Sequence, residues 1–172
     1  MTGNAARVAA QSGASVHVLG IDPGYGELGW GFVLDRPGNR REVLSSGWLL
    51  TDRSRPVGAR MDEVVAAVTG LLDAGPVDVV AIEDWTYQGP RSHGPNTMHL
   101  PELIGRIVQL CASHGNVGTV SRIPTTGIKR HLGARTKGDV QRVLRFSTKG
   151  QRPTSEHAWD AVAAAVCWRL GR

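Results

Sequence analysis

The feature that most constrains this chain is residues 16–33, where an apolar run ends on Asp22 and a Pro-Gly turn leads into a second apolar run. This order predicts a strand, an acid at its end, a tight turn and a second strand. A carboxylate there is held by a rigid strand and stays open to solvent, which suits a hard cation that needs fixed oxygen ligands. Asp-Pro-Gly is also favourable turn chemistry, so Asp22 alone could serve only the turn.

A second acid stands at the end of another apolar run. Residues 42–50 predict a third strand, and the short turns between the first three strands favour an antiparallel meander. Apolar residues at helical spacing follow in residues 57–72, and residues 77–82 then form a continuous apolar run that ends on Glu83. Because crossover connections are right-handed, we expect this fourth strand beside the first, with Glu83 facing Asp22.

The last predicted helix contributes a third acid. It follows the good N-cap residues Thr154 and Ser155 and is apolar nearly all round, which predicts burial. His157 and Asp160 are three residues apart and share one face near its start. A buried acid needs a partner, because an unpaired buried charge is costly. A cap or salt bridge would satisfy Asp160, and a metal ion is the alternative.

Positive charge is concentrated in one stretch of the sequence. The chain has a formal net charge of +5 and a pI near 9.9, which favours a polyanionic partner. Residues 121–153 contain one acid, Asp139, and nine cations, which are Arg122, Lys129, Arg130, Arg135, Lys137, Arg142, Arg145, Lys149 and Arg152. Such a stretch is either a solvated surface or a footprint for a phosphate backbone, and we favour the footprint because ordinary surfaces mix their signs.

A predicted loop over residues 84–96 combines aromatic residues, glycine, proline and a cation. It contains Trp85, Tyr87 and Arg91. The loop could be a plain connector, or its rings could stack on unpaired bases. Residues 98–111 then predict a second helix with Gly105 inside it, which suggests close approach to another backbone, either in the sheet or in a partner subunit.

Size and composition are typical of a single globular domain, and we expect a cytoplasmic location. The 172 residues can bury a core, and we expect residues 1–15 to be a flexible tail before a single domain over residues 16–172. The tail has no apolar segment typical of a secretory signal, and no run is long enough to cross a membrane. Cys111 and Cys167 lie in apolar helical patterns, so we expect buried thiols, compatible with a reducing cytosol.

One kind of chemistry is indicated by four residues taken together, which are Asp22, Glu83, Asp160 and His157. Carboxylates on rigid elements can hold two divalent ions for in-line phosphodiester hydrolysis, and the basic stretch offers an approach for the substrate. In this set the chain resembles the RuvC-type Holliday-junction resolvases of the ribonuclease H-like superfamily. The matching segments are residues 20–24, Ile82-Glu83, Lys129 and Lys137 on either side of Gly133, and residues 157–161.

The resemblance implies an α/β fold with a five-stranded mixed sheet, strands 1–3 antiparallel, flanked by helices. It also implies a homodimer that makes paired nicks in a four-way DNA junction, with two Mg²⁺ or Mn²⁺ ions per active site. By motif, Asp22, Glu83, His157 and Asp160 would be the catalytic metal ligands. Relatives use either Asp or His at the position of His157.

The resemblance further implies that Lys129 and Lys137 contact DNA phosphates. We expect Arg130 in the basic stretch and Arg91 in the loop to be further DNA contacts. In relatives an aromatic residue three positions after the Glu helps open the junction. Here that position is Thr86, with Trp85 and Tyr87 on either side, so either ring could take the role.

Other functions fit parts of the pattern. A nuclease of the same fold could act on flap, branched or RNA-containing substrates, since substrate choice does not follow from fold. Actin-like sugar kinases and ATPases also begin with a strand, an acid and a turn, but they need a second such domain, for which 172 residues leave no room. A non-catalytic DNA-binding module would not need the four-residue set.

Overall fold

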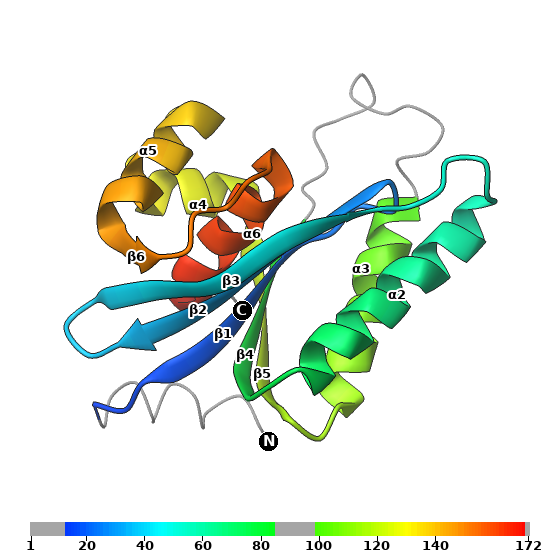
Figure 1. Cartoon of the computed structure of the whole chain (residues 1–172), viewed down its shortest axis with the longest axis horizontal. Coiled ribbons are helices and arrows are strands. Elements are labelled where there is room, and N and C mark those ends of the chain that lie inside the picture. The colour runs from blue at the N-terminus through cyan, green and yellow to red at the C-terminus, as the bar shows by residue number, and fades with distance from the viewer. Residues whose placement is uncertain (1–12, 85–98, 171–172) are drawn as a thin grey trace.

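The computed structural model describes residues 13–84 and 99–170, which form a mixed β-sheet with helices on both faces (Figure 1). The sheet order is β5-β4-β1-β2-β3-β6. The strands are β1 (Val16–Asp22), β2 (Glu27–Arg36), β3 (Arg40–Leu50), β4 (Val77–Asp84), β5 (Val117–Pro124) and β6 (Thr148–Gly150). The helices are α2 (Val57–Asp73), α3 (His99–Ser113), α4 (Thr125–His131), α5 (Lys137–Ser147), α6 (Glu156–Val166) and the short 3₁₀ helix η2 (Trp168–Leu170).

The predicted arrangement of the first four strands is confirmed. Strands β1, β2 and β3 pair antiparallel in sequence order, and β4 lies parallel to β1. The expected count of five strands is wrong, because β6 adds a short parallel strand to the free edge of β3. Its polar, basic sequence resembles a loop because an edge strand exposed to solvent needs no apolar alternation.

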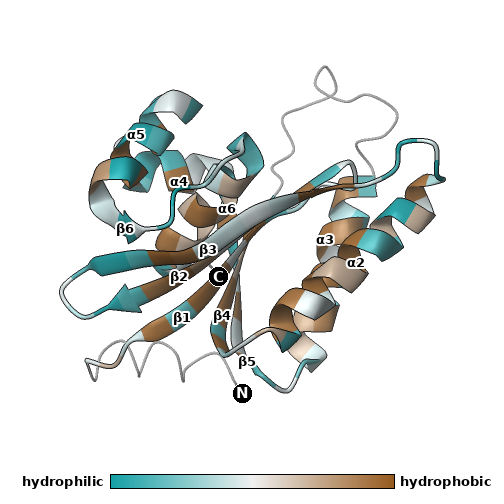
Figure 2. Ribbon diagram, viewed as in Figure 1, coloured by the Kyte–Doolittle hydropathy of each residue, from teal (hydrophilic) through white to brown (hydrophobic). Residues whose placement is uncertain are grey.

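The sheet separates two hydrophobic clusters (Figure 2). Helices α2 and α3 cover one face of the sheet, while α6, with α4 and α5 beyond it, covers the other (Figure 1). Alternate residues of β1 serve the two sides, with Val16 and Val18 in the α6 cluster and Leu19 and Ile21 in the α2–α3 cluster. This alternation determines which face each later side chain of the strand occupies.

Helix α6 lies unusually close to the central strands. A Cβ atom added to Gly20 would collide with the backbone of Ala161, and one added to Gly29 would collide with the backbone of His157. The expected burial of this helix is confirmed, since Ala158, Trp159 and residues 161–166 are all buried. Glycine in β1 and β2, facing an alanine-rich helix, therefore brings the start of α6 directly against the end of β1.

Gly105 has no close neighbour among the described residues. A Cβ atom added to it would meet nothing within 4 Å, so the expected close approach to the sheet is wrong. Its face of α3 is exposed instead. Contact with a partner subunit, the other explanation for this glycine, stays a prediction.

Cys111 and Cys167 are buried and free, as predicted, and burial raises the pKa of each thiol to about 12. Among the described residues, no helix combines the length and hydropathy needed to cross a bilayer. The predicted N-terminal tail falls almost wholly on residues 1–12, which lie outside the described residues.

Candidate active site

Three of the predicted site residues converge at one end of the sheet. One carboxylate oxygen from each of Asp22, Glu83 and Asp160 lies within 4.8 Å of the other two. Asp22 ends β1, Glu83 is the penultimate residue of β4, and Asp160 lies in the second turn of α6. Three acids that are 61 or more residues apart in the chain therefore form one cluster.

Strand register and pleat explain why Asp22 and Glu83 meet. Strands β1 and β4 pair in parallel with Ile21 opposite Ile82, so the next residues of both strands stand side by side. Asp22 continues the alternation of Val16 and Val18, which faces α6. Glu83 continues that of Val79 and Ala81, which faces α6 as well. Both acids thus project toward the helix that carries Asp160.

Glu83 is the most perturbed acid of the cluster. Burial, together with the nearby charge of Asp22, raises its pKa to about 7. The hydroxyl of Thr125 donates a hydrogen bond to its carboxylate at 2.7 Å and partly opposes this effect. Thr125 opens α4 and was not predicted from the sequence. Near neutral pH, Glu83 is therefore poised between its protonated and charged forms.

Asp160 is paired with Lys137. The ammonium of Lys137 lies 2.9 Å from Asp160 and 2.8 Å from Glu156, one helical turn earlier on α6. Burial raises the pKa of Asp160, against the effect of the lysine. Although partial burial opposes it, hydrogen bonding to Glu156 and Asp160 holds the pKa of Lys137 above its usual range. The salt bridge considered from the sequence is therefore present, and its partner is a residue expected to bind DNA.

His157 lies between two carboxylates. Its Nδ1 is 2.8 Å from Asp22, and its Nε2 is 2.6 Å from Glu27 at the start of β2. The hydrogen bond with Asp22 raises the pKa of His157 above its ordinary value. Sequence analysis did not select Glu27, because nothing in a strand-initial glutamate distinguishes it from an ordinary surface residue.

The residues present fit a divalent metal ion. Carboxylate oxygens are the ligands that Mg²⁺ and Mn²⁺ prefer, and three of them lie together on rigid elements. Burial, together with the nearby charge of Asp22, raises the pKa of Glu83 and of Asp160, so positive charge beside them would stabilise their charged forms. Lys137 and His157 supply part of it. A bound divalent cation would supply the rest.

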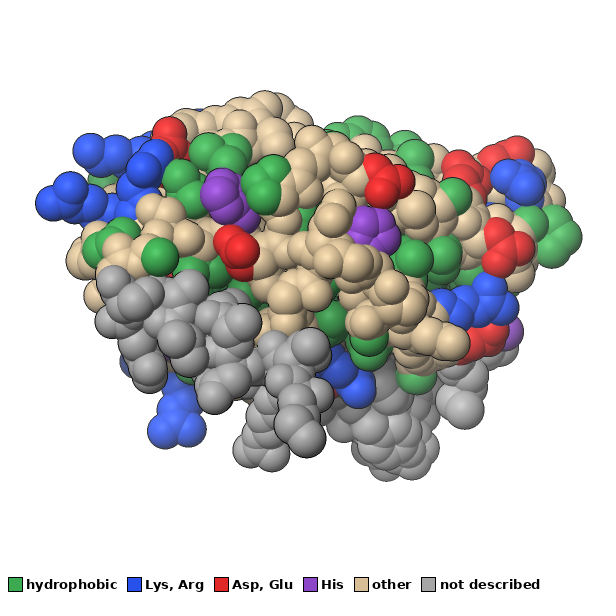
Figure 3. All heavy atoms as spheres, turned by 90° about the horizontal axis from the view of Figure 1, so that it is seen from below, with side chains coloured by type: hydrophobic (Ala, Val, Ile, Leu, Met, Phe, Trp, Pro, Cys, Tyr) green, Lys and Arg blue, Asp and Glu red, His purple; other side chains and the backbone are tan. Residues whose placement is uncertain are grey.

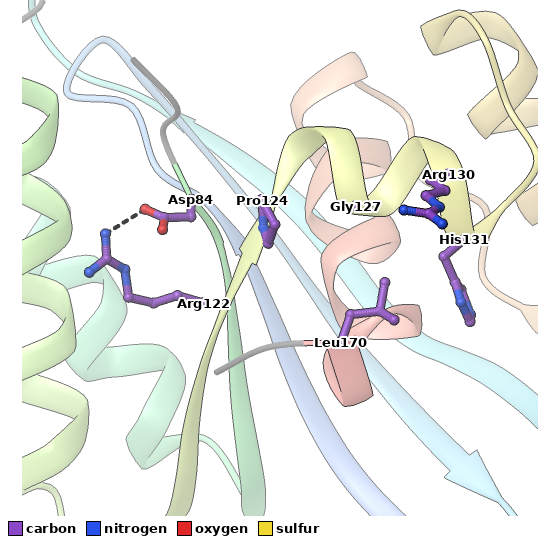
Figure 4. A pocket seen from close by; sticks show the side chains of 7 residues that line it. All are labelled: Asp84, Arg122, Pro124, Gly127, Arg130, His131 and Leu170. Atoms are coloured by element: carbon purple, nitrogen blue, oxygen red, sulfur yellow. Dashed lines mark hydrogen bonds and ion pairs between the residues drawn. The ribbon is translucent and has the colours of Figure 1, made fainter. Parts of the chain in front are cut away.

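Helix α4 directs two neighbouring cations to different places. Lys129 lines a small pocket together with Glu83, Lys137 and Asp160. Arg130 instead lines a separate open pocket of about 1000 Å³, shown in Figure 4. The other residues around that pocket are Asp84, Arg122, Pro124, Gly127, His131 and Leu170. Trp85, Tyr87 and Arg91, the other predicted DNA contacts, lie outside the described residues.

The basic stretch forms an exposed surface that extends from the acidic cluster, where Lys137 binds Asp160, to Lys149 in β6, which is level with the starting end of β1. It covers the end of β5, α4, α5 and β6, and all nine of its cations are exposed except the half-buried Lys129. Figure 3 shows the molecule from below, at the starting ends of β1 and β4, where the charged side chains are distributed differently from those of the basic stretch. There Lys and Arg gather at one end, and at the other end they mix with Asp and Glu.

Comparison with known proteins places this arrangement in a family. Residues 18–168 match the family model described as Crossover junction endodeoxyribonuclease RuvC. A protein of that name from Granulibacter bethesdensis is 32% identical over 157 residues, covering 90% of this chain and 85% of the relative. The one from Petrotoga mobilis is 29% identical over 154 residues, covering 87% and 91%.

Solved structures show the same fold. The structure of Thermus thermophilus RuvC superposes with a TM-score of 0.73 at 22% identity, covering 88% of this chain and 92% of that one. The same protein in complex with a Holliday junction substrate also gives 0.73, at 23% identity and with 90% and 93% coverage. The ribonuclease H-like fold expected from the sequence is confirmed, and the family model spans most of the chain. The chain therefore belongs to the RuvC family of crossover junction endodeoxyribonucleases.

Proposed function

We propose that this chain resolves four-way DNA junctions by paired, metal-dependent phosphodiester hydrolysis. The observation that carries the proposal is the convergence of Asp22, Glu83 and Asp160 at one end of the sheet, in a chain of the RuvC family. In this proposal, residues 16–172 form a single nuclease domain.

In this proposal Asp22, Glu83, Asp160 and His157 hold two Mg²⁺ or Mn²⁺ ions. When bound, such ions activate a water molecule and stabilise the leaving oxygen in phosphodiester hydrolysis. Asp22 has the central place, because it contacts His157 on one side and lies close to Glu83 and Asp160 on the other. Thr125 and Lys137 orient two of these carboxylates before an ion arrives.

We assign the DNA contacts to the cations beside the cluster. Lys129 and Lys137 line a pocket together with Glu83 and Asp160. They are therefore in a position to bind the phosphates next to the scissile bond. Arg130 and Arg122 would extend the track along the pocket of Figure 4. Each such contact releases condensed counterions, which makes affinity depend on salt.

A homodimer is part of the proposal. A four-way junction has two-fold symmetry, and paired nicks require two active sites. The exposed face of α3 around Gly105, which has space for a neighbouring backbone, is the proposed interface. We assign opening of the junction centre to Trp85 or Tyr87 by stacking. A cytoplasmic location, where the two buried thiols would stay reduced, completes the proposal.

The test is cleavage with Mg²⁺ of a four-way junction, a flap, a RNA–DNA hybrid and a linear duplex of matched length. We expect nicks at symmetric positions in the junction only. Asp22→Asn should abolish cleavage and retain junction binding, because it removes a ligand and a charge that repels phosphate. Preferred cutting of the flap or the hybrid would instead support a different ribonuclease H-like nuclease. Unchanged cleavage by the variant would refute the site assignment.

A further inference from the structure

Glu27 stands beside the carboxylate cluster without being part of it. Among the described residues, the group whose oxygens lie within 4.8 Å of one another contains Asp22, Glu83 and Asp160 only. Glu27 reaches His157 instead, with 2.6 Å between its carboxylate and Nε2. The other ring nitrogen, Nδ1, faces Asp22 at 2.8 Å. The imidazole is thus fixed at both ends.

The two ring nitrogens differ in what they can do. Nδ1 is directed at Asp22 and so toward the cluster, whereas Nε2 is directed away from it toward Glu27. A histidine that ligates a metal uses one nitrogen and commonly donates its other N–H to a carboxylate, which fixes the tautomer and the ring orientation. Glu27 is placed for that second role.

From this geometry we infer that Glu27 is a positioning residue, which holds the proton of His157 on Nε2 and presents the Nδ1 lone pair to a metal ion beside Asp22. The inference rests on the proposed function, in which His157 is a metal ligand. Glu27 acts through the imidazole and does not itself touch the ion or the DNA.

The surroundings of Glu27 support a fixed carboxylate. Its side chain is one-third exposed, and the exposed guanidinium of Arg53 approaches it only at 3.4 Å, so this ion pair adds little. The backbone next to it is held, because Thr51 donates its backbone N–H to the carbonyl of Gly26 and its hydroxyl to the carbonyl of Tyr25. The guanidinium of Arg60 bonds to the Thr51 hydroxyl and so braces the turn between β1 and β2. The carboxylate that orients His157 therefore starts from a rigid strand.

The test measures binding of Mn²⁺ alone to the full chain without DNA, by the electron paramagnetic resonance signal of the free ion. Glu27→Ala should weaken Mn²⁺ binding by about 10–100-fold, the usual effect of removing a carboxylate that supports a ligating histidine. Glu27→Gln should lose less, because its amide oxygen still accepts from Nε2. Arg53→Ala, which removes only the exposed partner of Glu27, is the matched control and should leave the affinity unchanged.

A double-mutant cycle with His157→Ala separates this inference from the proposed function. If Glu27 acts through the imidazole, Glu27→Ala should weaken Mn²⁺ binding no further once His157 is gone. An equal loss in both backgrounds would overturn the inference, since Glu27 would then act independently of the ring. If His157→Ala weakens Mn²⁺ binding but Glu27→Ala does not, the inference fails alone. If His157→Ala has no effect, its assignment as a ligand fails, and the inference fails with it.

A spectroscopic signature checks the hydrogen bond directly. In the Mg²⁺-loaded protein, the Nε2 proton of His157 should give a downfield, slowly exchanging NMR resonance, because it is hydrogen bonded to a carboxylate. Glu27→Ala should abolish the resonance, and Arg53→Ala should retain it. Persistence of the resonance in Glu27→Ala would overturn the inference.

Discussion

Replacing Glu83 with Gln should stabilise the metal-free protein, although it removes a proposed catalytic ligand. Glu83 is mostly buried beside Asp22, and its pKa is raised from its ordinary 4.5 to about 7. Gln has nearly the same shape and still accepts the hydrogen bond from Thr125. The substitution therefore removes the charge and leaves the packing.

The raised pKa determines where the effect appears on the pH scale. Below pH 4.5 Glu83 is protonated in both the folded and the unfolded chain, so its ionisation contributes nothing. Between pH 4.5 and about 7 the unfolded chain releases the proton while the folded chain retains it, so stability falls as pH rises. At about 1.4 kcal/mol per pH unit, the folded state is destabilised by about 3 kcal/mol above pH 7.

The assay is urea unfolding of wild type and Glu83→Gln across pH 4 to 8, with EDTA and then with Mg²⁺. With EDTA, the free energies of unfolding should agree at the acid end and diverge to about 3 kcal/mol in favour of the variant above pH 7. Mg²⁺ should stabilise wild type more than the variant, because the ion binds the charged cluster. Glu42→Gln, on the exposed pair with Arg36, is the control and should change stability by less than about 1 kcal/mol.

A constant difference between wild type and Glu83→Gln at every pH would refute the reasoning, because it would show an effect of packing rather than of ionisation. The reasoning would also be refuted if Glu83→Gln were less stable than wild type at pH 8 with EDTA.

Further predictions concern DNA, packing, assembly and pH. Lys129→Ala with Lys137→Ala should lower the salt slope of junction binding by about 2, as measured by titration at several salt concentrations. Gly29→Ala should lower the melting temperature of the protein strongly, since its Cβ meets the backbone of α6. Gly105→Arg should shift the protein from dimer to monomer in sedimentation, without loss of helicity by circular dichroism. His157→Asp should retain cleavage and move the acid limb of its single-turnover pH–rate profile to lower pH, because Asp stays charged further down.

The positions of Asp22 and Glu83 could be predicted from the sequence because local and topological rules both apply to them. Each follows an apolar run, and the right-handed crossover through α2 places β4 beside β1. The alternation along each strand could have added that both acids face α6, since it follows from counting back to Val18 and Val79. For these two acids, the apolar pattern of each strand and the handedness of the crossover are therefore enough to predict the position in the fold.

The partners of Glu83, His157 and Asp160 could not be predicted in this way. Thr125, Glu27 and Lys137 come from elements whose own patterns carry no sign of the contact. Each pairing depends on how closely a helix approaches the sheet or another helix, as Gly20 and Gly29 illustrate for α6 against the sheet. Periodicity identifies an element and its buried face, but it does not give the distance between two elements.

The structure also changes the meaning of the positive charge counted in the sequence. Lys137 belongs to the basic stretch by position, yet its ammonium is bound to Asp160 and Glu156. Around the site, five carboxylates from Asp22, Glu27, Glu83, Glu156 and Asp160 surround the ammonium of Lys137 and the imidazole of His157.

Without metal, the centre of the site is therefore negative although the chain carries a net charge of +5. The outer cations attract a DNA backbone while the centre repels its phosphates, and bound divalent ions would reverse the sign at the centre alone. Metal binding and close approach of the scissile phosphate are thus coupled by charge. The same argument explains why Asp22→Asn, which removes one repelling carboxylate, should bind a junction at least as tightly as wild type while failing to cut it.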